Sequence, residues 1–340
     1  MNATVLLGLL GCGPRAEHIH LPAIRALSGV RLTVAYDPSP ERRDAVARLA
    51  PGCRSVASPE ALFETRVVDA VIIAAPVAKR AALAVQSLGA GSGIPVLIDP
   101  PMAGSVEEGL WIRDAEQIVR LPVLVGYNRR RWRPVEAVRR VLASDPTPAG
   151  QEPGIESTLL RTGDPGAPPP DESGFDPRVL LDLNVHLDLV RHLMGRELAT
   201  VTARRDPREQ ILVQATFHGG GTATCRVGRA ERSEERVLIR AGKRAFELRP
   251  GSDRARPSGG TARAVIDIAD ATGRKLTSAQ DSLARSYERQ LQAFVEAVAT
   301  RSKIAPGTTD GLAALLAVDA VRRSLAEGSL EREVPLAPSV

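Results

Sequence analysis

The first residues with a clear chemical meaning form a glycine-containing turn near the N-terminus. Gly11 and Gly13 follow an apolar run of strand length and precede a helical pattern. Gly11 suits a tight bend after a strand, Gly13 lets the backbone approach a pyrophosphate, and Ala16 lets the helix pack on the sheet. The amides at a helix N-terminus also favour negative charge. The turn therefore predicts a dinucleotide seat formed by Gly11, Cys12, Gly13, Pro14, Arg15 and Ala16.

The next strand-like run ends in a carboxylate, Asp37, which bears on the choice of nucleotide. A carboxylate there can accept both ribose hydroxyls of NAD and would repel a 2′-phosphate, so Asp37 favours NAD. Arg42 and Arg43 follow closely, and NADP stays possible because they can bind that phosphate. Asp37 also fits a structural role, in which it opens the turn Asp37–Pro40. The turn alone leaves S-adenosylmethionine and flavin open as well.

Asp182 and His186 are four residues apart in a helical pattern, a spacing that places both side chains on one face. A histidine near its ordinary pKa of about 6.5 suits general acid–base catalysis. A carboxylate one turn away can orient the ring and stabilise its charged form. The same spacing is also typical of a surface pair or of helix support. The residues alone leave a catalytic and a structural interpretation open.

Apolar runs of strand length alternate with amphipathic helical patterns over the first 127 residues. This alternation predicts a doubly wound parallel sheet with helices on both faces, so the fold class is α/β. The strand-like runs are Thr4–Leu10, Arg31–Tyr36, Val67–Ala74, Pro95–Ile98 and Pro122–Tyr127, and the helical patterns span 17–27, 40–50, 79–88 and 106–118.

After Tyr127 the pattern changes, because strand-like runs follow one another without helices between them. Runs joined by short glycine-containing turns pair as antiparallel hairpins, which predicts an α+β domain with a largely antiparallel open sheet. The predicted strands are 155–161, 199–204, 211–217, 222–227, 237–241 and 245–249, and the predicted helices are 134–142, 179–194, 279–299 and 309–326. We expect the loop Gly163–Pro177 to shape the pocket.

Composition excludes several other classes of protein. The net charge is +5, but arginine is scattered along the chain and the 3% of aromatic residues are not interleaved with a basic stripe, which argues against a nucleic-acid partner. Cys12, Cys53 and Cys225 are widely spaced and predict neither a disulfide framework nor a metal site. The short N-terminal apolar run predicts no export leader, and no segment reaches the roughly 18 apolar residues of a membrane span. We therefore expect a cytoplasmic protein.

Six segments carry a family resemblance: residues 8–13 with 20–23, 68–76, 96–103, 125–128 with Pro134, 181–188 and 287–298. In this order they resemble the Gfo/Idh/MocA family, the glucose-fructose oxidoreductase and inositol dehydrogenase group. The resemblance implies a nicotinamide-dependent oxidoreductase that transfers a hydride to or from a sugar, a cyclitol or a related small molecule, and an imine stays open as an alternative substrate. It also implies a homodimer or homotetramer formed through the open sheet.

The resemblance further implies a division of the chain and roles for several residues. An NAD(P)-binding Rossmann domain would span residues 1–125, and an α+β substrate-binding and oligomerisation domain residues 126–340. His186 would be catalytic, and Asp182 would contact the substrate. Ala75, Pro76, Asp99 and Pro100 would lie at the cofactor, and Asn128, Arg129 and Lys79 are candidate substrate contacts.

Arg129 begins the run Arg129–Arg131, which follows a strand end. Its guanidinium groups can bind a carboxylate or phosphate in bidentate fashion, and the run is equally consistent with a solvated face. Lys79 is the only lysine in the first 240 residues. It is either a substitute catalytic ammonium group or a solvated lysine at the start of a helix.

The chain departs from the family pattern at one position of chemical importance. Family members usually carry Glu-Lys-Pro after the fifth strand, whereas this chain has Asp99-Pro100-Pro101. Proline neither donates a hydrogen bond nor carries charge, so His186 would carry more of the proton transfer. Ala75 and Arg80 also replace a usual Thr and His. These departures keep two alternatives open: a cofactor- or partner-binding protein without redox turnover, and an enzyme that uses bound NAD transiently for elimination or hydrolysis.

Overall fold

The computed structural model describes residues 4–64, 67–89, 92–144, 152–162, 176–242, 244–249, 264–270 and 275–338. The chain divides into two compact units. The first unit comprises Met1–Asn128, Ala284–Leu315 and Ala337–Val340, and the second comprises Arg129–Leu283 and Leu316–Leu336. This division differs from the expected one at residue 125, because Ala284–Leu315 joins the first unit.

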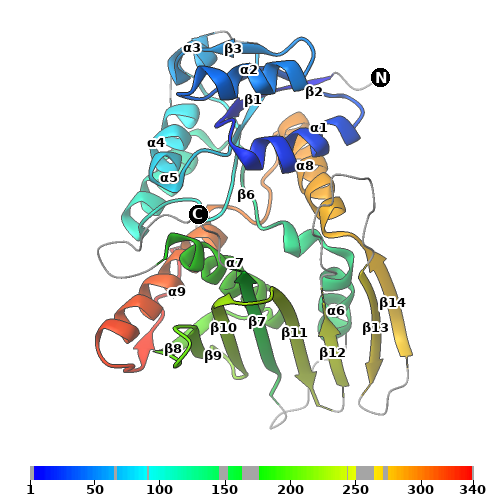
Figure 1. The fold of residues 1–340 in the computed structure, drawn as a ribbon, viewed down its shortest axis with the longest axis vertical. Coiled ribbons are helices and arrows are strands. Elements are labelled where there is room, and N and C mark those ends of the chain that lie inside the picture. Colours follow the sequence, from blue (N-terminus) through cyan, green and yellow to red (C-terminus); the bar gives the residue numbers. More distant parts are fainter. Residues whose placement is uncertain are drawn as a thin grey trace. The chain divides into compact units, whose positions relative to one another are not determined.

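The first unit contains a parallel sheet with six strands in the order β3-β2-β1-β4-β5-β6. Helices cover both of its faces, with α4 and α5 on one side and α1 and α8 on the other (Figure 1). The predicted doubly wound fold is confirmed. The strands are β1 (Val5–Leu10), β2 (Val30–Tyr36), β3 (Arg54–Val56), β4 (Ala70–Ile73), β5 (Val96–Ile98) and β6 (Val123–Val125).

The helices of this unit agree with the predicted ones except for α8, which begins later than expected, and α3, which was missed together with β3. A three-residue strand followed by a six-residue helix is too short to show a hydrophobic period. None of the described helices is long and apolar enough to cross a membrane. The helices are α1 (Leu21–Ala26), α2 (Pro40–Leu49), α3 (Pro59–Glu64), α4 (Val77–Leu88), α5 (Val106–Val119) and α8 (Leu283–Thr300), and α9 (Thr308–Ala326) contributes residues to both units.

The helix after the glycine turn begins as a π-helical turn, η1 (Ala16–His20), before α1 continues as an α-helix. The Leu21 amide donates to the Ala16 carbonyl five residues back, instead of the usual four. Pro22 has no amide hydrogen, so the regular hydrogen-bond pattern is interrupted at this point. The turn ends on His20, which is buried.

Helix α8 belongs to the first unit because its apolar face completes the core of that unit. Leu291, Phe294 and Val295 are buried in one cluster with Leu7 and Leu9 of the central strand β1. Residues almost 300 positions apart therefore share one core, which is why periodicity in the sequence did not assign α8 to this unit.

The second unit contains a nine-stranded sheet in the order β14-β13-β12-β11-β7-β10-β9-β8-β15. Strands β7 and β10 pair in parallel, and the other neighbours are antiparallel, as predicted. The strands are β7 (Gly154–Thr162), β8 (Leu198–Arg205), β9 (Ile211–Phe217), β10 (Thr222–Ala230), β11 (Glu234–Ala241), β12 (Arg244–Leu248), β13 (Ala264–Asp270), β14 (Lys275–Asp281) and β15 (Arg332–Glu333).

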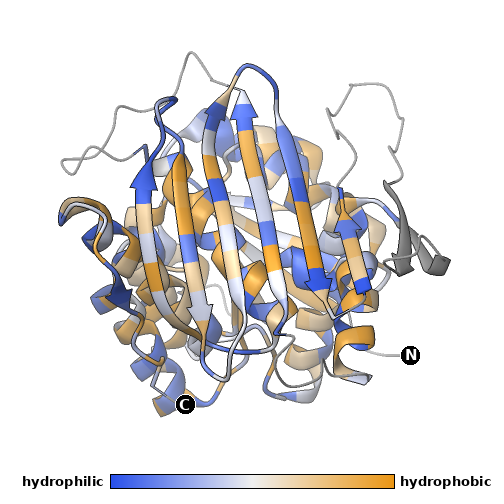
Figure 2. Cartoon of the chain, turned by 90° about the horizontal axis from the view of Figure 1, so that it is seen from below, coloured by the Kyte–Doolittle hydropathy of each residue, from blue (hydrophilic) through white to orange (hydrophobic). Residues whose placement is uncertain are grey.

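Helix α7 (Pro177–Met194) packs on one face of this sheet and carries both candidate catalytic residues. The Asp176 side chain caps its start by accepting from the Arg178 amide at 2.7 Å, and Gly195, with φ +67°, ends it in the left-handed region. The other helix of this unit is α6 (Arg133–Ser144). Figure 2 shows the opposite face of the sheet with no helix in front of it and with hydrophilic and hydrophobic residues mixed along the strands.

Two expectations for the second half need correction. Strands β13 and β14 were not predicted, and the helix expected from Ala279 begins at Leu283 because residues 275–281 belong to β14. Of the expected pocket loop Gly163–Pro177, residues 163–175 lie outside the described part of the chain. Pro177 itself is the first residue of α7.

The role of α8 predicts the effect of a truncation in its apolar face. Phe294→Ala should lower the free energy of unfolding by about 3–5 kcal/mol, because it leaves a cavity in the first core. Gln292→Ala on the exposed face of the same helix is the control and should stay within about 0.5 kcal/mol. Urea unfolding of the full chain measures both, and equal values would contradict the assignment of α8 to this core.

Candidate active site

The glycine turn has the geometry of a nucleotide seat. Gly11 has φ +102°, and a Cβ there would lie 2.6 Å from the Ala75 amide nitrogen, so the fold itself requires glycine at this position. Gly13 has no positive φ, and a Cβ there would meet no protein atom within 4 Å. No contact within the described protein requires a glycine at position 13. Close approach of a ligand to the backbone would require one, because a side chain would block it. The buried Ala16 packs against the sheet, and Pro14 is exposed.

Asp37 combines the two roles that the sequence left open. Its Oδ1 accepts from the Ser39 amide at 3.0 Å, which is the expected turn. Its Oδ2 accepts from the Cys12 amide at 2.8 Å, so the carboxylate lies directly against the glycine turn. Each oxygen keeps lone-pair capacity for a ribose hydroxyl. Burial raises the pKa of the Cys12 thiol to about 12, which leaves it an inert part of the seat.

Asp99, expected at the cofactor, is the centre of a buried ion cluster. Arg15 donates to its two oxygens at 2.6 and 3.0 Å, and His20 Nε2 lies 3.2 Å from both. Burial opposes ionisation of Asp99, but Arg15 and His20 outweigh it and hold its pKa well below the usual range. Tyr287 of α8 also interacts electrostatically with Arg15. The cluster fixes the end of the glycine turn to the end of β5.

Arg80 joins the ends of two neighbouring strands. Its Nε donates to the Ala75 carbonyl at 2.9 Å, and its Nη1 donates to the carbonyls of Asp99 and Pro101 at 3.0 and 2.7 Å. The guanidinium is 6% exposed, and this burial lowers its pKa to about 10. Arg80 therefore supports the backbone on both sides of Pro100. In the sequence, Arg80 stands out only as a departure from the family pattern.

The remaining predicted residues of the first unit lie in different environments. Ala75 and Pro100 are buried, whereas Pro76 and Lys79 are exposed at the start of α4. Because Lys79 is exposed, the interpretation as a solvated lysine at the start of a helix is favoured over that of a substitute catalytic ammonium group. The Asn128 amide, a candidate substrate contact, donates instead to the Ser286 hydroxyl of α8 at 2.7 Å.

His186 lies on the sheet-facing side of α7 and is completely buried. Its Nδ1 is 2.5 Å from the Ser157 hydroxyl of β7, and its Nε2 has no hydrogen-bond partner among the described residues. Glu235 Oε1 of β11 lies 3.9 Å from Nε2. Burial lowers the pKa of His186 from 6.5 to about 3, so the expectation of a near-ordinary pKa is wrong and the ring is neutral near pH 7.

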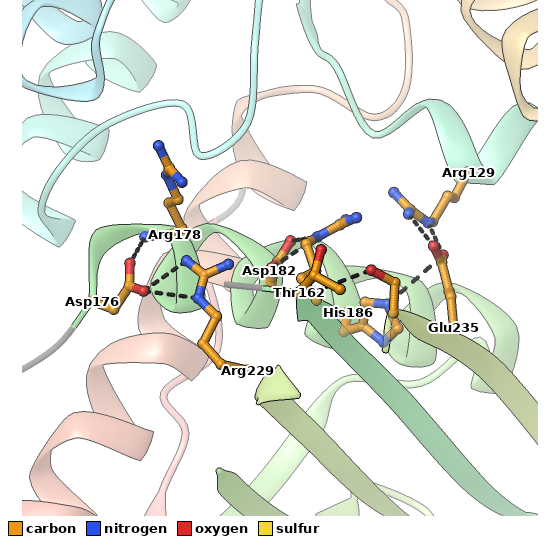
Figure 3. Close-up of polar contacts among 10 residues, drawn as sticks. Arg129, Thr162, Asp176, Arg178, Asp182, His186, Arg229 and Glu235 are labelled. Atoms are coloured by element: carbon orange, nitrogen blue, oxygen red, sulfur yellow. Dashed lines mark hydrogen bonds and ion pairs between the residues drawn. The ribbon is translucent and has the colours of Figure 1, made fainter. Parts of the chain in front are cut away.

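Asp182 does not orient the His186 ring as expected, because the two side chains have different partners. Both Asp182 oxygens accept from Arg161 Nε, at 2.9 and 3.0 Å, while the ring is held by Ser157. Burial raises the pKa of Asp182, and Arg161 offsets this only in part. Figure 3 shows Asp182 and His186 along α7.

Arg129, a candidate anion-binding residue, is already paired. Its Nε and Nη2 donate to the two oxygens of Glu235 at 2.6 and 2.9 Å (Figure 3). Burial opposes ionisation of Glu235, but Arg129 outweighs it and lowers the pKa of that carboxyl to about 2. Arg130 makes an equivalent pair with Asp188. The run Arg129–Arg131 is therefore not a solvated face.

Several residues of the candidate site were missed by sequence reasoning. Ser157 had a readable signal, because it is a polar residue at an inward position of β7 between Ile155 and Leu159. Glu235 and Arg161 had none, because their partners lie 106 and 21 positions away in the sequence. Among the described residues, no group of His, Cys, Asp and Glu could hold a metal ion.

Comparison with known proteins decides the family. Residues 5–127 match the family described as "Oxidoreductase family, NAD-binding Rossmann fold". The chain is 28% identical over 345 residues to an inositol 2-dehydrogenase of Rhizobium meliloti, with 98% of this chain and 100% of the relative covered. Residues 5–127 therefore belong to the Gfo/Idh/MocA oxidoreductase family, and the similarity to an inositol 2-dehydrogenase extends over the rest of the chain.

Solved structures share the fold of this chain. Myo-inositol dehydrogenase from Lactobacillus casei, solved with NAD(H) and myo-inositol, is 16% identical with a TM-score of 0.77, and the match covers 99% of this chain and 98% of that one. A levoglucosan dehydrogenase solved with NADH and L-sorbose is 18% identical with a TM-score of 0.79, with 98% and 100% covered. At this identity the likeness shows the fold.

Burial of neutral His186 predicts a dependence of stability on pH. An unfolded histidine has a pKa of about 6.5, against about 3 in the folded protein. Between these values the unfolded state binds more protons, so stability is fully present above pH 6.5 and falls as the pH is lowered. The contribution approaches about 1.4 kcal/mol per pH unit.

His186→Gln should therefore show a weaker fall in unfolding free energy between pH 6.5 and 5 than the unaltered protein. His218→Gln, which changes an exposed histidine, is the matched control and should keep the full dependence. Denaturant unfolding at several pH values measures the slopes. Identical slopes for His186→Gln and the unaltered protein would show that His186 is not buried as a neutral ring.

Proposed function

We propose that this protein transfers a hydride between NAD(H) and a carbinol or ketone of a polyhydroxylated small molecule, a cyclitol or sugar. One observation carries this proposal: His186 is buried on α7, and its Nε2 has no hydrogen-bond partner among the described residues. A buried nitrogen without a partner is costly, so its retention indicates that a ligand supplies the partner. The full-length relative named inositol 2-dehydrogenase favours a cyclitol-like substrate.

The cofactor would be held by the first unit. The open space at Gly13 fits a pyrophosphate, and the Asp37 carboxylate beside it fits the ribose hydroxyls of NAD. Arg43 donates to the Asp37 carbonyl at 2.6 Å, which keeps a cation near this site and leaves NADP as a second cofactor. When bound, the nicotinamide supplies or accepts the hydride.

His186 would exchange the substrate proton. In the tautomer whose Nδ1–H donates to Ser157, Nε2 presents a lone pair that can accept the proton of a substrate hydroxyl. Glu235, 3.9 Å from Nε2, would then stabilise the imidazolium. Asp182 would hold a neighbouring hydroxyl. Ser157 is in this account a positioning residue.

The family resemblance assigns the usual catalytic lysine to the position of Pro100, so the proton must be exchanged without an ammonium group there. Lys79 is exposed at the start of α4. His186 would therefore carry the proton transfer with Asp182 and Glu235. Pro100 and the low pKa of His186, about 3, favour one second candidate, a family member that binds the cofactor without redox turnover.

The two units would divide these tasks. The first unit would bind the cofactor, and the second would bind the substrate and support a homodimer or homotetramer. The sheet face without a helix in front of it is the surface that would make this contact (Figure 2).

Cofactor binding and turnover together separate the candidates. NADH fluorescence titration measures binding, and absorbance at the NADH band measures turnover over a panel of cyclitols, sugars and imines. Binding with turnover supports the oxidoreductase, and binding without turnover on the whole panel supports the second candidate. Absence of binding for both NADH and NADPH would overturn both.

The proposed role of His186 gives the first prediction for activity. His186→Ala should abolish turnover because it removes the nitrogen lone pair that accepts the substrate proton, while NADH affinity should stay within about threefold. Stopped assays and NADH titration measure the two quantities. Retained turnover would exclude His186 as the acid–base group.

The charge of Asp37 gives a prediction for cofactor selectivity. Asp37→Asn keeps an oxygen that can accept from the Cys12 amide but removes the negative charge that repels a 2′-phosphate. The ratio of NADH to NADPH affinity should fall by about tenfold or more. Asp44→Asn, a nearby change on α2, is the control. An unchanged ratio would show that Asp37 serves only the turn.

A further inference from the structure

Two arginines lie side by side at the ends of neighbouring strands in the second unit. Arg161 of β7 and Arg229 of β10 are register partners in the parallel pair of this sheet. Their strand positions follow buried residues that face α7, so both side chains leave the sheet on the α7 side. Neighbouring strands are about 4.8 Å apart, so the two guanidinium groups arise close together.

Each arginine uses only part of its hydrogen-bonding capacity within the protein. Arg161 donates to Asp182 through Nε alone, and Arg229 donates to Asp176 through Nε and Nη2. Among the described residues, no partner is found for either Nη of Arg161 or for Nη1 of Arg229. The side chains are 44% and 27% exposed, so these donors can reach a ligand.

The arginines adjoin the candidate catalytic residues. Arg161 contacts Asp182 directly, and both Arg161 and Arg229 lower the pKa of that carboxyl. The charge of Arg161 adds to burial in lowering the pKa of His186. Figure 3 shows Arg229 reaching Asp176 at the start of α7, with Asp182 and His186 further along the same helix. The free donors of Arg161 and Arg229 thus lie beside Asp182, one helical turn from the buried His186.

Like charges directly opposite on neighbouring strands destabilise a sheet. Asp182 and Asp176 offset this repulsion, because each carboxylate pairs with one guanidinium and fixes its orientation. The N–H groups on the other side of each guanidinium then point away from the paired carboxylate. Planar, oriented guanidinium groups match the oxygens of a carboxylate or phosphate. By contrast, the side chains of Arg129 and Arg130, which stand out in the sequence, are only 9% and 11% exposed and each pairs with both oxygens of a carboxylate, Glu235 or Asp188.

We propose that the substrate carries an oxyanion group, a carboxylate or a phosphate, which Arg161 and Arg229 bind while the reacting carbinol lies at His186. This inference rests on the proposed oxidoreductase function and names its substrate class. A neutral cyclitol of the kind named for the relatives would offer the outer N–H groups of the two arginines no charged partner. The substrate is therefore an acidic or phosphorylated polyol.

Binding to the NADH-saturated full chain tests the inference with matched pairs of probes. Isothermal titration compares glucuronate with glucose, and inositol 1-phosphate with myo-inositol, at low and at physiological salt. One anionic probe should bind at least about tenfold more tightly than its neutral partner, and its affinity should fall as salt is added. The pair that shows this selectivity distinguishes a carboxylate from a phosphate.

Variants assign the selectivity to the two arginines. Arg229→Gln should lower the ratio of anionic to neutral affinity by about tenfold, because it removes a charge-assisted donor. Arg161→Lys keeps a cation beside Asp182 but loses the planar donor pair, so it should lower the same ratio without unpairing that carboxylate. Arg226→Gln, on the exposed face of β10, is the matched control and should leave the ratio unchanged.

The outcomes separate this inference from the proposed function. Neutral probes that bind or turn over as well as the anionic ones, with no effect of Arg229→Gln, would overturn the acidic substrate and leave the oxidoreductase intact. If no anionic probe binds while NADH still does, the proposal of an acidic substrate is overturned as well. Failure to bind NADH would overturn the proposed function, and anion selectivity that is lost in both arginine variants would still support the oxyanion site.

Discussion

Pairing of buried charge is the constraint on which the candidate residues of each unit depend. A carboxylate removed from water is ionised only if a cation and hydrogen bonds replace its hydration. Asp99 is 1% exposed and stays ionised because Arg15 and His20 lie against it, and Glu235 depends in the same way on Arg129. Each pair joins segments far apart in the sequence, so the pairs also fix the turn and the strands that carry them.

The same constraint decides which groups remain for a ligand. Arg15 and Arg129 each donate through Nε and Nη2 to both oxygens of one carboxylate, and Arg80 is committed to three carbonyls. Arg161 and Arg229 are committed only in part. His186 lies among these charges as a neutral ring, because burial without a bonded carboxylate disfavours its cation. The chemistry of the second unit is thus set by partnerships among charged groups.

The features that were predicted correctly are those in which the local hydrophobic period indicates which residues are buried. The alternation of apolar runs and helices predicted the parallel sheet, and the glycine spacing predicted a turn whose Gly11 has φ +102°. Prediction from the sequence failed where a contact joins distant segments. Asp182 and His186 share a helix face as their spacing predicts, yet Arg161 and Ser157 from β7 take the hydrogen bonds expected between them. Strand β3, with three residues, was too short to show a period.

The sequence by itself determined the family, the doubly wound first sheet, the open antiparallel second sheet and the nucleotide turn. These features are written in short-range patterns, because glycine conformation and hydrophobic period act within a few residues. Only the tertiary structure decided that α8 completes the first core, that His186 is buried and neutral, and which arginines are already paired. Burial and ion pairing depend on which distant segments meet, and no local pattern records that.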